Sequence, residues 1–223
     1  MKLSPIEISL PDTGIASTFH LEAVNLECVR SDRLLFAGLN LSLRPGNLIQ
    51  IEGPNGSGKT SLLRILCGLT SATQGEVRWC GQDIKKARAD YMAEVAYLGH
   101  SPGIKGDLTP IENLAIARGL ARANSEISVD EALGRLEMTD FDEQPVRTLS
   151  AGQRRRVALA RLLATRATVW ILDEPFTALD RSGVRLVEEM LAGHLASGGM
   201  AVLTTHHPIA IAESRVTRVD LGG

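Results

Sequence analysis

Hydrophobic and polar positions along the chain predict strands and helices that alternate. Short apolar runs bounded by polar or turn residues predict strands. They cover residues 20–29, 39–43, 48–51, 76–79, 95–98, 169–172 and 201–204. Apolar residues spaced three or four apart predict helices over 61–67, 153–165 and 184–195. We therefore expect an α/β fold.

The pattern between residues 109 and 137 is helical only. Pro110, typical of a first helical position, precedes one apolar face, and a second face follows it. The apolar residues of the two faces are Ile111, Leu114, Ile116, Val129, Ala132, Leu133 and Leu136. We expect a helical subdomain over about 101–158, inserted into a single domain that spans residues 20–223. Residues 1–19 contain Pro and Gly without sustained periodicity and are expected to be a loosely ordered extension.

A glycine-rich loop joins the strand predicted over 48–51 to the helix that follows it. Its residues have the spacing Gly-x-x-x-x-Gly-Lys-Thr of a nucleotide phosphate-binding loop. They are Gly53, Pro54, Asn55, Gly56, Ser57, Gly58, Lys59 and Thr60. Glycines let backbone N–H groups converge on phosphate oxygens, and the helix N-terminus adds its positive end. The sequence therefore predicts a site for ATP or GTP.

Three side chains at the end of this loop have distinct expected roles. Lys59 supplies a mobile positive charge for the phosphates. Thr60 offers its hydroxyl to Mg²⁺, which prefers oxygen ligands shared between protein and phosphate. Ser61 can bond to another phosphate oxygen. Mg²⁺ is thus the expected companion of the bound nucleotide.

Two carboxylates, Asp173 and Glu174, follow the apolar strand predicted over 169–172. Carboxyl ends of strands in a parallel sheet are where such folds bind ligands. We expect Asp173 to reach Mg²⁺ and Glu174 to accept a proton from the water that attacks the γ-phosphate. Taken alone, a strand end whose acids only face solvent is an equally good interpretation. The phosphate loop in the same chain favours the catalytic interpretation.

A second anion site is predicted where Leu149-Ser-Ala-Gly-Gln153 begins a helix. Ser150 supplies a hydroxyl, Gly152 exposes backbone, and the helix N-terminus attracts negative charge. Two phosphate sites in one chain are explained if two copies of the chain face each other. Ser150 and Gly152 of one copy would then close over the γ-phosphate held by Lys59 of the other.

Composition narrows the expected partners. The chain has 24 Lys and Arg against 26 Asp and Glu, a net charge of −2, so no basic field supports a nucleic-acid partner. The three cysteines, Cys28, Cys67 and Cys80, are too few and too scattered for a metal cluster or a disulfide framework. The sequence has no run of about 18 apolar residues that could span a bilayer, so we expect any membrane attachment to go through a partner.

These motifs, followed by Ala178-Leu-Asp180 and Thr205-His206, occur in the order found in ATP-binding subunits of ABC transporters. The chain resembles that family over about residues 21–221. The resemblance implies a P-loop NTPase core of the ABC type, with an N-terminal antiparallel β region and an inserted helical subdomain. It also implies ATP hydrolysis and a head-to-tail dimer of two copies with ATP between them.

The same resemblance assigns roles to three further residues. His206 would contact the γ-phosphate, although a surface histidine is otherwise the better interpretation. Gln153 would belong to the signature loop that covers the nucleotide of the other copy. Asp180 would belong to the loop that links the two subunits across the dimer.

Two positions depart from the family pattern. His100 stands where members usually have a glutamine that senses Mg²⁺ and the membrane subunit. Arg30 stands where they usually stack an aromatic ring on adenine, and its planar guanidinium could stack instead. We retain both as candidate nucleotide contacts. Arg154, Arg155 and Arg156 form a charge run that we interpret as a solvated or subunit-facing surface rather than a nucleic-acid patch.

Three segments narrow the resemblance to one branch of the family. Residues 99–105, 149–161 and 170–180 are similar to the heme-exporter ATP-binding subunits of bacterial cytochrome c maturation. This implies a membrane-spanning partner subunit, a peripheral position at the cytoplasmic face of the inner membrane, and a role in heme delivery or export. Residues 101–113 are our candidate docking surface for that partner. The alternatives are the ATPase of another ABC exporter and a soluble ABC ATPase without a transport role.

Overall fold

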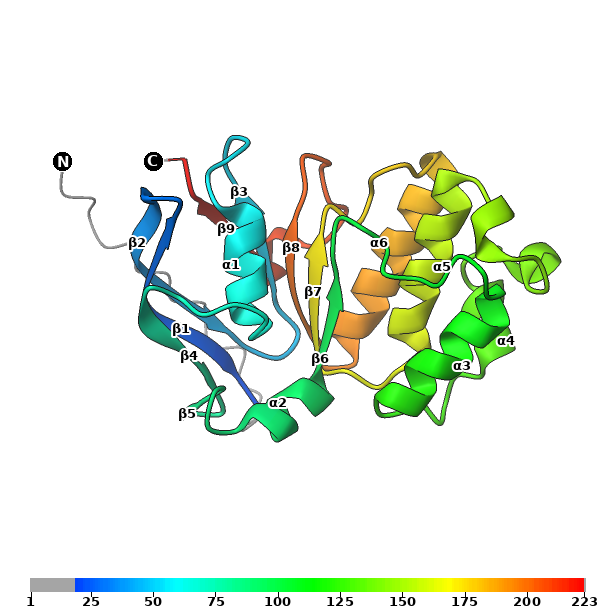
Figure 1. Ribbon diagram of the computed structural model, residues 1–223, viewed down its shortest axis with the longest axis horizontal. Coiled ribbons are helices and arrows are strands. Elements are labelled where there is room, and N and C mark those ends of the chain that lie inside the picture. Colours follow the sequence, from blue (N-terminus) through cyan, green and yellow to red (C-terminus); the bar gives the residue numbers. More distant parts are fainter. Residues whose placement is uncertain (1–18, 223) are drawn as a thin grey trace.

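The computed structural model describes residues 19–222. Two sheets, with helices between and beside them, make up the fold (Figure 1). The strands are β1 (Leu21–Arg30), β2 (Arg33–Leu43), β3 (Leu48–Glu52), β4 (Gln74–Trp79), β5 (Gln82–Asp83), β6 (Val95–Leu98), β7 (Val169–Asp173), β8 (Met200–Thr204) and β9 (Val216–Asp220). The α-helices are α1 (Lys59–Leu66), α2 (Arg88–Glu94), α3 (Pro110–Leu120), α4 (Val129–Gly134), α5 (Ala151–Ala164) and α6 (Arg181–Ala196). Short 3₁₀ helices cover Thr139–Phe141, Val146–Thr148 and Glu213–Arg215.

An antiparallel sheet forms the N-terminal part of the fold, with strand order β2-β1-β4-β5. Its first two strands form a hairpin in which Arg30 pairs with Arg33. The residues between them, Ser31 and Asp32, have φ of 49° and 60°. A two-residue turn with positive φ at both positions matches the right-handed twist of the strands it joins. β2 therefore starts at Arg33, earlier than the strand predicted from residue 39.

A parallel sheet carries the second half of the fold, in the order β6-β7-β8-β3-β9. β7 and β8 are buried along their whole length because helices cover both faces of the sheet. α1 lies between the two sheets, where Ile49 and Ile51 of β3 pack. α5 and α6 cover the opposite face, where Leu48 and Leu203 pack (Figure 1). The carboxyl edge of the parallel sheet is thus held from both sides.

Helices α3, α4 and α5 pack on one another beside the parallel sheet, away from the antiparallel sheet (Figure 1). Their shared core includes Leu114, Leu133, Leu136, Val157 and Leu159. Capping boxes start α3 at Thr109 and α5 at Ser150. Residue 158, where the helical subdomain is predicted to end, lies in the middle of α5. The helix continues without a break to Ala164, so it crosses that boundary.

Three elements, β5, α2 and β9, are absent from those that the sequence predicts. β5 has only two residues, and α2 buries only Tyr91. β9 interrupts its apolar pattern with the exposed Arg218 and Asp220. The predicted extension lies outside the described residues except for Phe19, which stacks on Trp79 with ring centroids 5.7 Å apart. Within residues 19–222, no helix is long and apolar enough to cross a membrane.

Candidate nucleotide-binding and catalytic site

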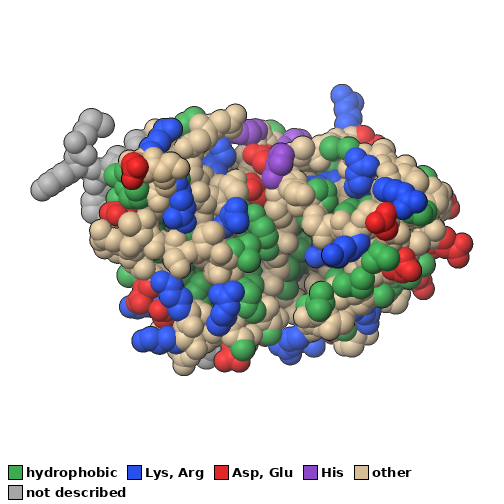
Figure 2. Space-filling model, in the orientation of Figure 1, with side chains coloured by type: hydrophobic (Ala, Val, Ile, Leu, Met, Phe, Trp, Pro, Cys, Tyr) green, Lys and Arg blue, Asp and Glu red, His purple; other side chains and the backbone are tan. Residues whose placement is uncertain are grey.

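Loops converge where β3, β7 and β8 end side by side in the parallel sheet. The phosphate loop follows β3, Glu174 follows β7, and His206 comes two residues after β8. The carboxyl edge of such a sheet is where α/β folds bind ligands. Figure 2 shows histidine side chains beside acidic ones along this edge, at the top of the view. The sheet therefore assembles motifs that are far apart in sequence.

The phosphate loop depends on glycine at two crowded positions. Gly53 has φ of 136°, and a Cβ there would lie 2.8 Å from Ser57 Oγ. Gly58 has φ of 103°, and a Cβ there would lie 3.0 Å from the Cβ of Leu35. Gly58 is also the N-cap of α1 and offers no side chain to the first-turn N–H groups. These N–H groups therefore remain donors for an anion.

The polar side chains of the loop fit a bound phosphate. Lys59 Nζ donates to Gly53 O (2.5 Å) and Pro54 O (3.1 Å), so its charge lies against the loop. Ser57 Oγ is buried and has no hydrogen-bond partner among the described residues. A buried hydroxyl without a partner costs about 1–3 kcal/mol. A phosphate oxygen at this position would satisfy it.

A hydroxyl–carboxylate network joins the phosphate loop to β7 and β8. Thr60 Oγ1 donates to Asp173 Oδ2 (2.8 Å), although the two residues are 113 positions apart. Thr204 Oγ1 donates to Asp173 Oδ1 (2.7 Å). Asp173 is buried, with 3% of its surface exposed. Thr60 and Asp173 thus present neighbouring oxygen atoms, the ligand type that Mg²⁺ prefers, so the two residues fit the predicted ion.

Glu174 and His206, the two residues expected next to the γ-phosphate, are neighbours in space. Glu174 Oε1 lies 3.7 Å from His206 Nε2. Glu174 has φ of 50°, an uncommon value for a residue other than glycine. Its backbone N–H faces Thr204, with distances of 3.0 Å to Oγ1 and 3.2 Å to the carbonyl oxygen. These interactions fix the backbone of Glu174, the residue that follows Asp173 in the sequence, at the carboxyl edge of the sheet.

The signature residues lie at the N-terminus of α5. Ser150 Oγ accepts from Gln153 N (3.2 Å), and Gln153 Oε1 accepts from Ser150 N (2.8 Å). A Cβ at Gly152 would lie 2.8 Å from Ala178 O, so only glycine allows this approach. Within residues 19–222, no hydrogen bond or ion pair joins Ser150, Gly152 or Gln153 to the phosphate loop. A single chain therefore leaves the two predicted phosphate sites apart.

Asp180 connects the loop after β7 to α5. It caps α6 by accepting from Gly183 N (2.8 Å), and it pairs with Arg156 Nη2 (2.8 Å). The Gly183 N–H and the Arg156 guanidinium lower the pKa of the Asp180 carboxyl. Arg156 also pairs with Glu137 (2.5 Å). Asp180 is thus a structural link within one chain as well as the predicted dimer contact.

The interpretation of the arginine run as a solvated or subunit-facing surface is wrong for Arg155. Arg156 is not solvated either, but it pairs with Asp180, so its position facing a second subunit stays a prediction. Arg155 is 3% exposed, and the Arg156 side chain is 11% exposed. Arg155 donates to the backbone carbonyls of Asp173, Glu174 and Pro175, at the end of β7 and just after it. A sequence signal for this burial exists, because Arg155 shares an i, i+3, i+7 stripe with Ala158 and Leu162, which are both buried.

Within residues 19–222, no hydrogen bond or ion pair joins the side chains of Arg30, His100 or Ser61 to the network around Asp173. Arg30 Nη2 donates to Ser71 O (3.0 Å), on the loop before β4. His100 is exposed in the bend after β6. Ser61 is half-buried in the first turn of α1. Their roles toward the nucleotide remain predictions.

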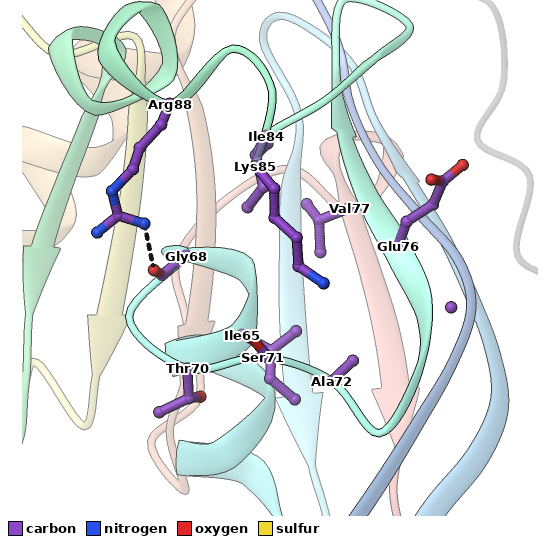
Figure 3. A pocket seen from close by; sticks show the side chains of 11 residues that line it. Ile65, Gly68, Thr70, Ser71, Ala72, Glu76, Val77, Ile84, Lys85 and Arg88 are labelled. Carbon is purple, nitrogen blue, oxygen red and sulfur yellow. Dashed lines mark hydrogen bonds between the residues drawn. The ribbon is translucent and has the colours of Figure 1, made fainter.

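Two hollows differ in their relation to this edge. A hollow of about 660 Å³ borders the phosphate loop and is lined by Gly53, Pro54, Thr205 and His206 among others. A smaller cavity of about 100 Å³ lies past the C-terminal end of α1, between that helix and β4 (Figure 3). There Arg88 Nη1 donates to Gly68 O (3.1 Å). The predicted site residues do not line this smaller cavity, so it is separate from the nucleotide site.

Comparison with known proteins decides the family. The family model described as "ABC transporter" matches residues 36–177. The chain belongs to the ABC transporter family. The cytochrome c biogenesis ATP-binding export protein CcmA of Methylococcus capsulatus is 54% identical over 190 residues, which are 85% of this chain and 92% of that protein. CcmA of Escherichia coli K12 is 48% identical over 201 residues, 90% of this chain and 96% of that protein.

Solved structures support the ABC fold of this ATP-binding subunit. An ABC transporter ATP-binding protein from Pyrococcus furiosus aligns with a TM-score of 0.76 at 22% identity, covering 91% of this chain and 97% of that one. The dimeric ATP-binding cassette MJ0796, bound to ADP and phosphate, aligns with a TM-score of 0.72 at 23% identity, covering 91% and 95%. The predicted fold class and the resemblance to this family are therefore confirmed. The chain is an ABC-type ATPase subunit close to the CcmA proteins.

Proposed function

We propose that the chain is the ATP-hydrolysing subunit of an ABC transporter complex that drives heme delivery or export for c-type cytochrome biogenesis. The observation that carries this proposal is 46–54% identity to proteins named for cytochrome c biogenesis and export, over 85–94% of the chain. In this proposal the chain is a peripheral subunit at the cytoplasmic face of the bacterial inner membrane.

The hydrolysis chemistry is proposed for the residues at the sheet edge. Backbone N–H groups of the phosphate loop, to which Pro54 contributes none, hold the phosphates together with Lys59. Thr60 and Asp173 would hold Mg²⁺, which supplies positive charge to the phosphate oxygens when it is bound. Glu174 accepts a proton from the attacking water, and its neighbour His206 contacts the γ-phosphate.

A second copy of the chain completes this site in the proposal. Ser150, Gly152 and Gln153 of one copy cover the γ-phosphate on the phosphate loop of the other, and Asp180 lies at the contact between them. The position of the signature residues at an α-helix N-terminus supports this role, because such an end attracts anions. Closing and opening of the dimer would convert ATP binding and hydrolysis into rigid-body motion.

A CcmB-like membrane-spanning subunit is the proposed receiver of this motion, docked on residues 101–113. Arg161 of α5 donates to Gly103 O (2.7 Å), so this segment is tied to the helix that begins with the signature residues. A displacement of the docked segment would therefore reach Ser150. We propose no nucleic-acid partner, because the net charge is −2 and both signs are mixed over the face in Figure 2.

The substitution Glu174→Gln tests the assigned base. It keeps the size and hydrogen-bonding ability of the side chain but removes its basicity. We expect ATP binding to persist while the turnover number falls by roughly 100-fold or more. Chromatography with ATP should then show a trapped dimer. Glu189→Gln, on the exposed face of α6, is the matched control and should hydrolyse ATP like the wild type. Wild-type turnover in Glu174→Gln would remove Glu174 as the base.

Heme staining of c-type cytochromes tests the cargo. Cells that carry Glu174→Gln in place of the wild type, at equal abundance, should lose covalently heme-bound cytochromes. Normal levels would instead point to another ABC exporter. Co-purification from detergent distinguishes the remaining alternative, a soluble ABC ATPase, because only a transporter subunit should bring a hydrophobic membrane protein with it.

A further inference from the structure

The guanidinium of Arg155 bonds to the backbone of two separate loops. Nη2 donates to Asp173 O (2.9 Å) and Glu174 O (2.6 Å), and Nε donates to Pro175 O (3.2 Å). Nη1 donates to Gly99 O (3.0 Å), at the start of the loop that contains His100. The side chain therefore joins three consecutive carbonyls, which begin with the last residue of β7, to the loop after β6.

No carboxylate forms an ion pair with Arg155 within residues 19–222, so its charge is balanced in a different way. Burial lowers the pKa of its guanidinium, while the nearby carboxylates of Asp173 and Glu174 act in the opposite direction. Even buried ion pairs can often be replaced by apolar residues without loss of stability, so a buried charge is weak evidence of stabilisation. Arg155 makes four hydrogen bonds to backbone carbonyls, so its burial is better explained by the segments that it joins than by a gain in stability.

Arg155 holds the peptide of Glu174 in an uncommon conformation. Glu174 has φ of 50°, which disfavours a residue with a Cβ by roughly 1–2 kcal/mol. Thr204 accepts a hydrogen bond from the N–H of Glu174, and Arg155 donates one to the carbonyl oxygen of Glu174. If either hydrogen bond is removed, the peptide can relax and move the carboxylate away from the sheet edge.

We propose that Arg155 is a positioning residue for ATP hydrolysis, which fixes the backbone of Glu174 and ties it to the start of the His100 loop. This rests on the proposed function, in which Glu174 is the base. Arg161, six residues further along α5, donates to Gly103 O in the same loop. Through Arg155 and Arg161, α5 thus contacts the peptide of Glu174 and also the loop that leads into the proposed docking segment.

Steady-state kinetics of Arg155→Lys and Arg155→Gln test the proposal. Lysine keeps the charge but lacks the planar fork that reaches several carbonyls at once. We expect the turnover number of both variants to fall at least tenfold, because small misplacements of a catalytic group have effects of about this size. KM for ATP should change by less than about threefold, because the phosphate loop is untouched. Arg185→Gln, on the exposed face of α6, is the control and should keep wild-type turnover.

Chemical rescue separates positioning from folding. Arg155→Ala leaves space for a free guanidinium ion, which can donate to the same carbonyls. We expect millimolar guanidinium, far below denaturing concentrations, to restore part of the turnover of Arg155→Ala and none of that of Glu174→Gln. Absence of any rescue, or turnover of Arg155→Lys within twofold of the wild type, would overturn the proposal.

Hydrogen exchange gives a readout that does not depend on turnover. In Arg155→Lys, the amide hydrogens of residues 174–177 and 99–103, other than the two prolines, should exchange faster than in the wild type, while those of β3 should not. Unchanged exchange in both segments overturns the positioning role. If the wild-type chain does not hydrolyse ATP, the proposed function is contradicted. If the wild type hydrolyses ATP and the Arg155 variants do so equally well, only the positioning role of Arg155 is contradicted.

Discussion

Burial keeps the imidazole of His194 neutral near the end of α6. Its ring stacks on Trp170, with centroids 3.8 Å apart and planes 4° from parallel. Nε2 lies 3.2 Å from Met200 O, and Gly199 has no Cβ to collide with the ring. Desolvation lowers the pKa of His194 from 6.5 to about 4. The folded protein therefore resists protonation of a residue that the unfolded chain protonates readily.

This single residue should make the fold sensitive to mild acid. Between pH 6.5 and about 4, the unfolded state binds a proton at His194 that the folded state does not, so stability rises with pH there. On lowering the pH from 7 to 5, the wild type should lose about 2 kcal/mol more unfolding free energy than His194→Phe, which keeps an aromatic ring on Trp170. Urea unfolding of both proteins at the two pH values measures this difference, and equal losses would contradict it.

Buried elements are the ones that hydrophobic patterns predict well. The strands predicted over 48–51 and 169–172 end within one residue of β3 and β7, because both strands are almost wholly buried. β2 starts six residues before its predicted start. The hydrophobic pattern misses these residues because the first of them are exposed and the turn preceding them lacks glycine. The burial of Arg155 is missed although it shares an apolar stripe with Ala158 and Leu162, because a run of charged residues normally indicates an exposed surface.

Helix capping should contribute measurably at the start of α3. Thr109 Oγ1 accepts from Glu112 N (3.2 Å), and Glu112 Oε2 accepts from Thr109 N (2.8 Å). Thr109→Ala removes one of these two bonds and should lower the unfolding free energy by about 1 kcal/mol. Chemical denaturation measures it. Thr217→Ala, a substitution in β9 away from any helix start, serves as the comparison, and a loss no larger than experimental error at Thr109 would show that the cap is unimportant.

At the scale of the whole molecule, the order of motifs predicted the site because parallel strands end at one edge. Thr60 and Asp173 meet in the structure as expected from their places after β3 and at the end of β7. Between residues 19 and 222, neither a hydrogen bond nor an ion pair joins the signature residues or Asp180 to the phosphate loop of the same chain. Their proposed contacts are with the phosphate loop of a second copy. The sequence pattern of one chain does not predict distances between two copies.

Nucleotide binding should stabilise the whole fold through the phosphate loop. A ligand that binds only the folded state at 100 times its dissociation constant adds about 2.7 kcal/mol. Saturating ATP with Mg²⁺ should therefore raise the melting temperature of the wild type by several degrees. Lys59→Ala removes the charge at the loop and should abolish most of this increase while leaving the melting temperature without nucleotide close to that of the wild type. An equal increase in both proteins would show that ATP binds elsewhere.

The left-handed backbone of Glu174 also bears on how this chain can change over evolutionary time. At φ of 50°, the backbone conformation has a free energy roughly 1 kcal/mol lower for glycine than for glutamate. A substitution of Glu174 by glycine would thus stabilise the fold, but it would remove the side chain that the proposed hydrolysis requires. If descendants of this chain keep an acidic residue at this position, selection for activity has outweighed the gain in stability that glycine would give.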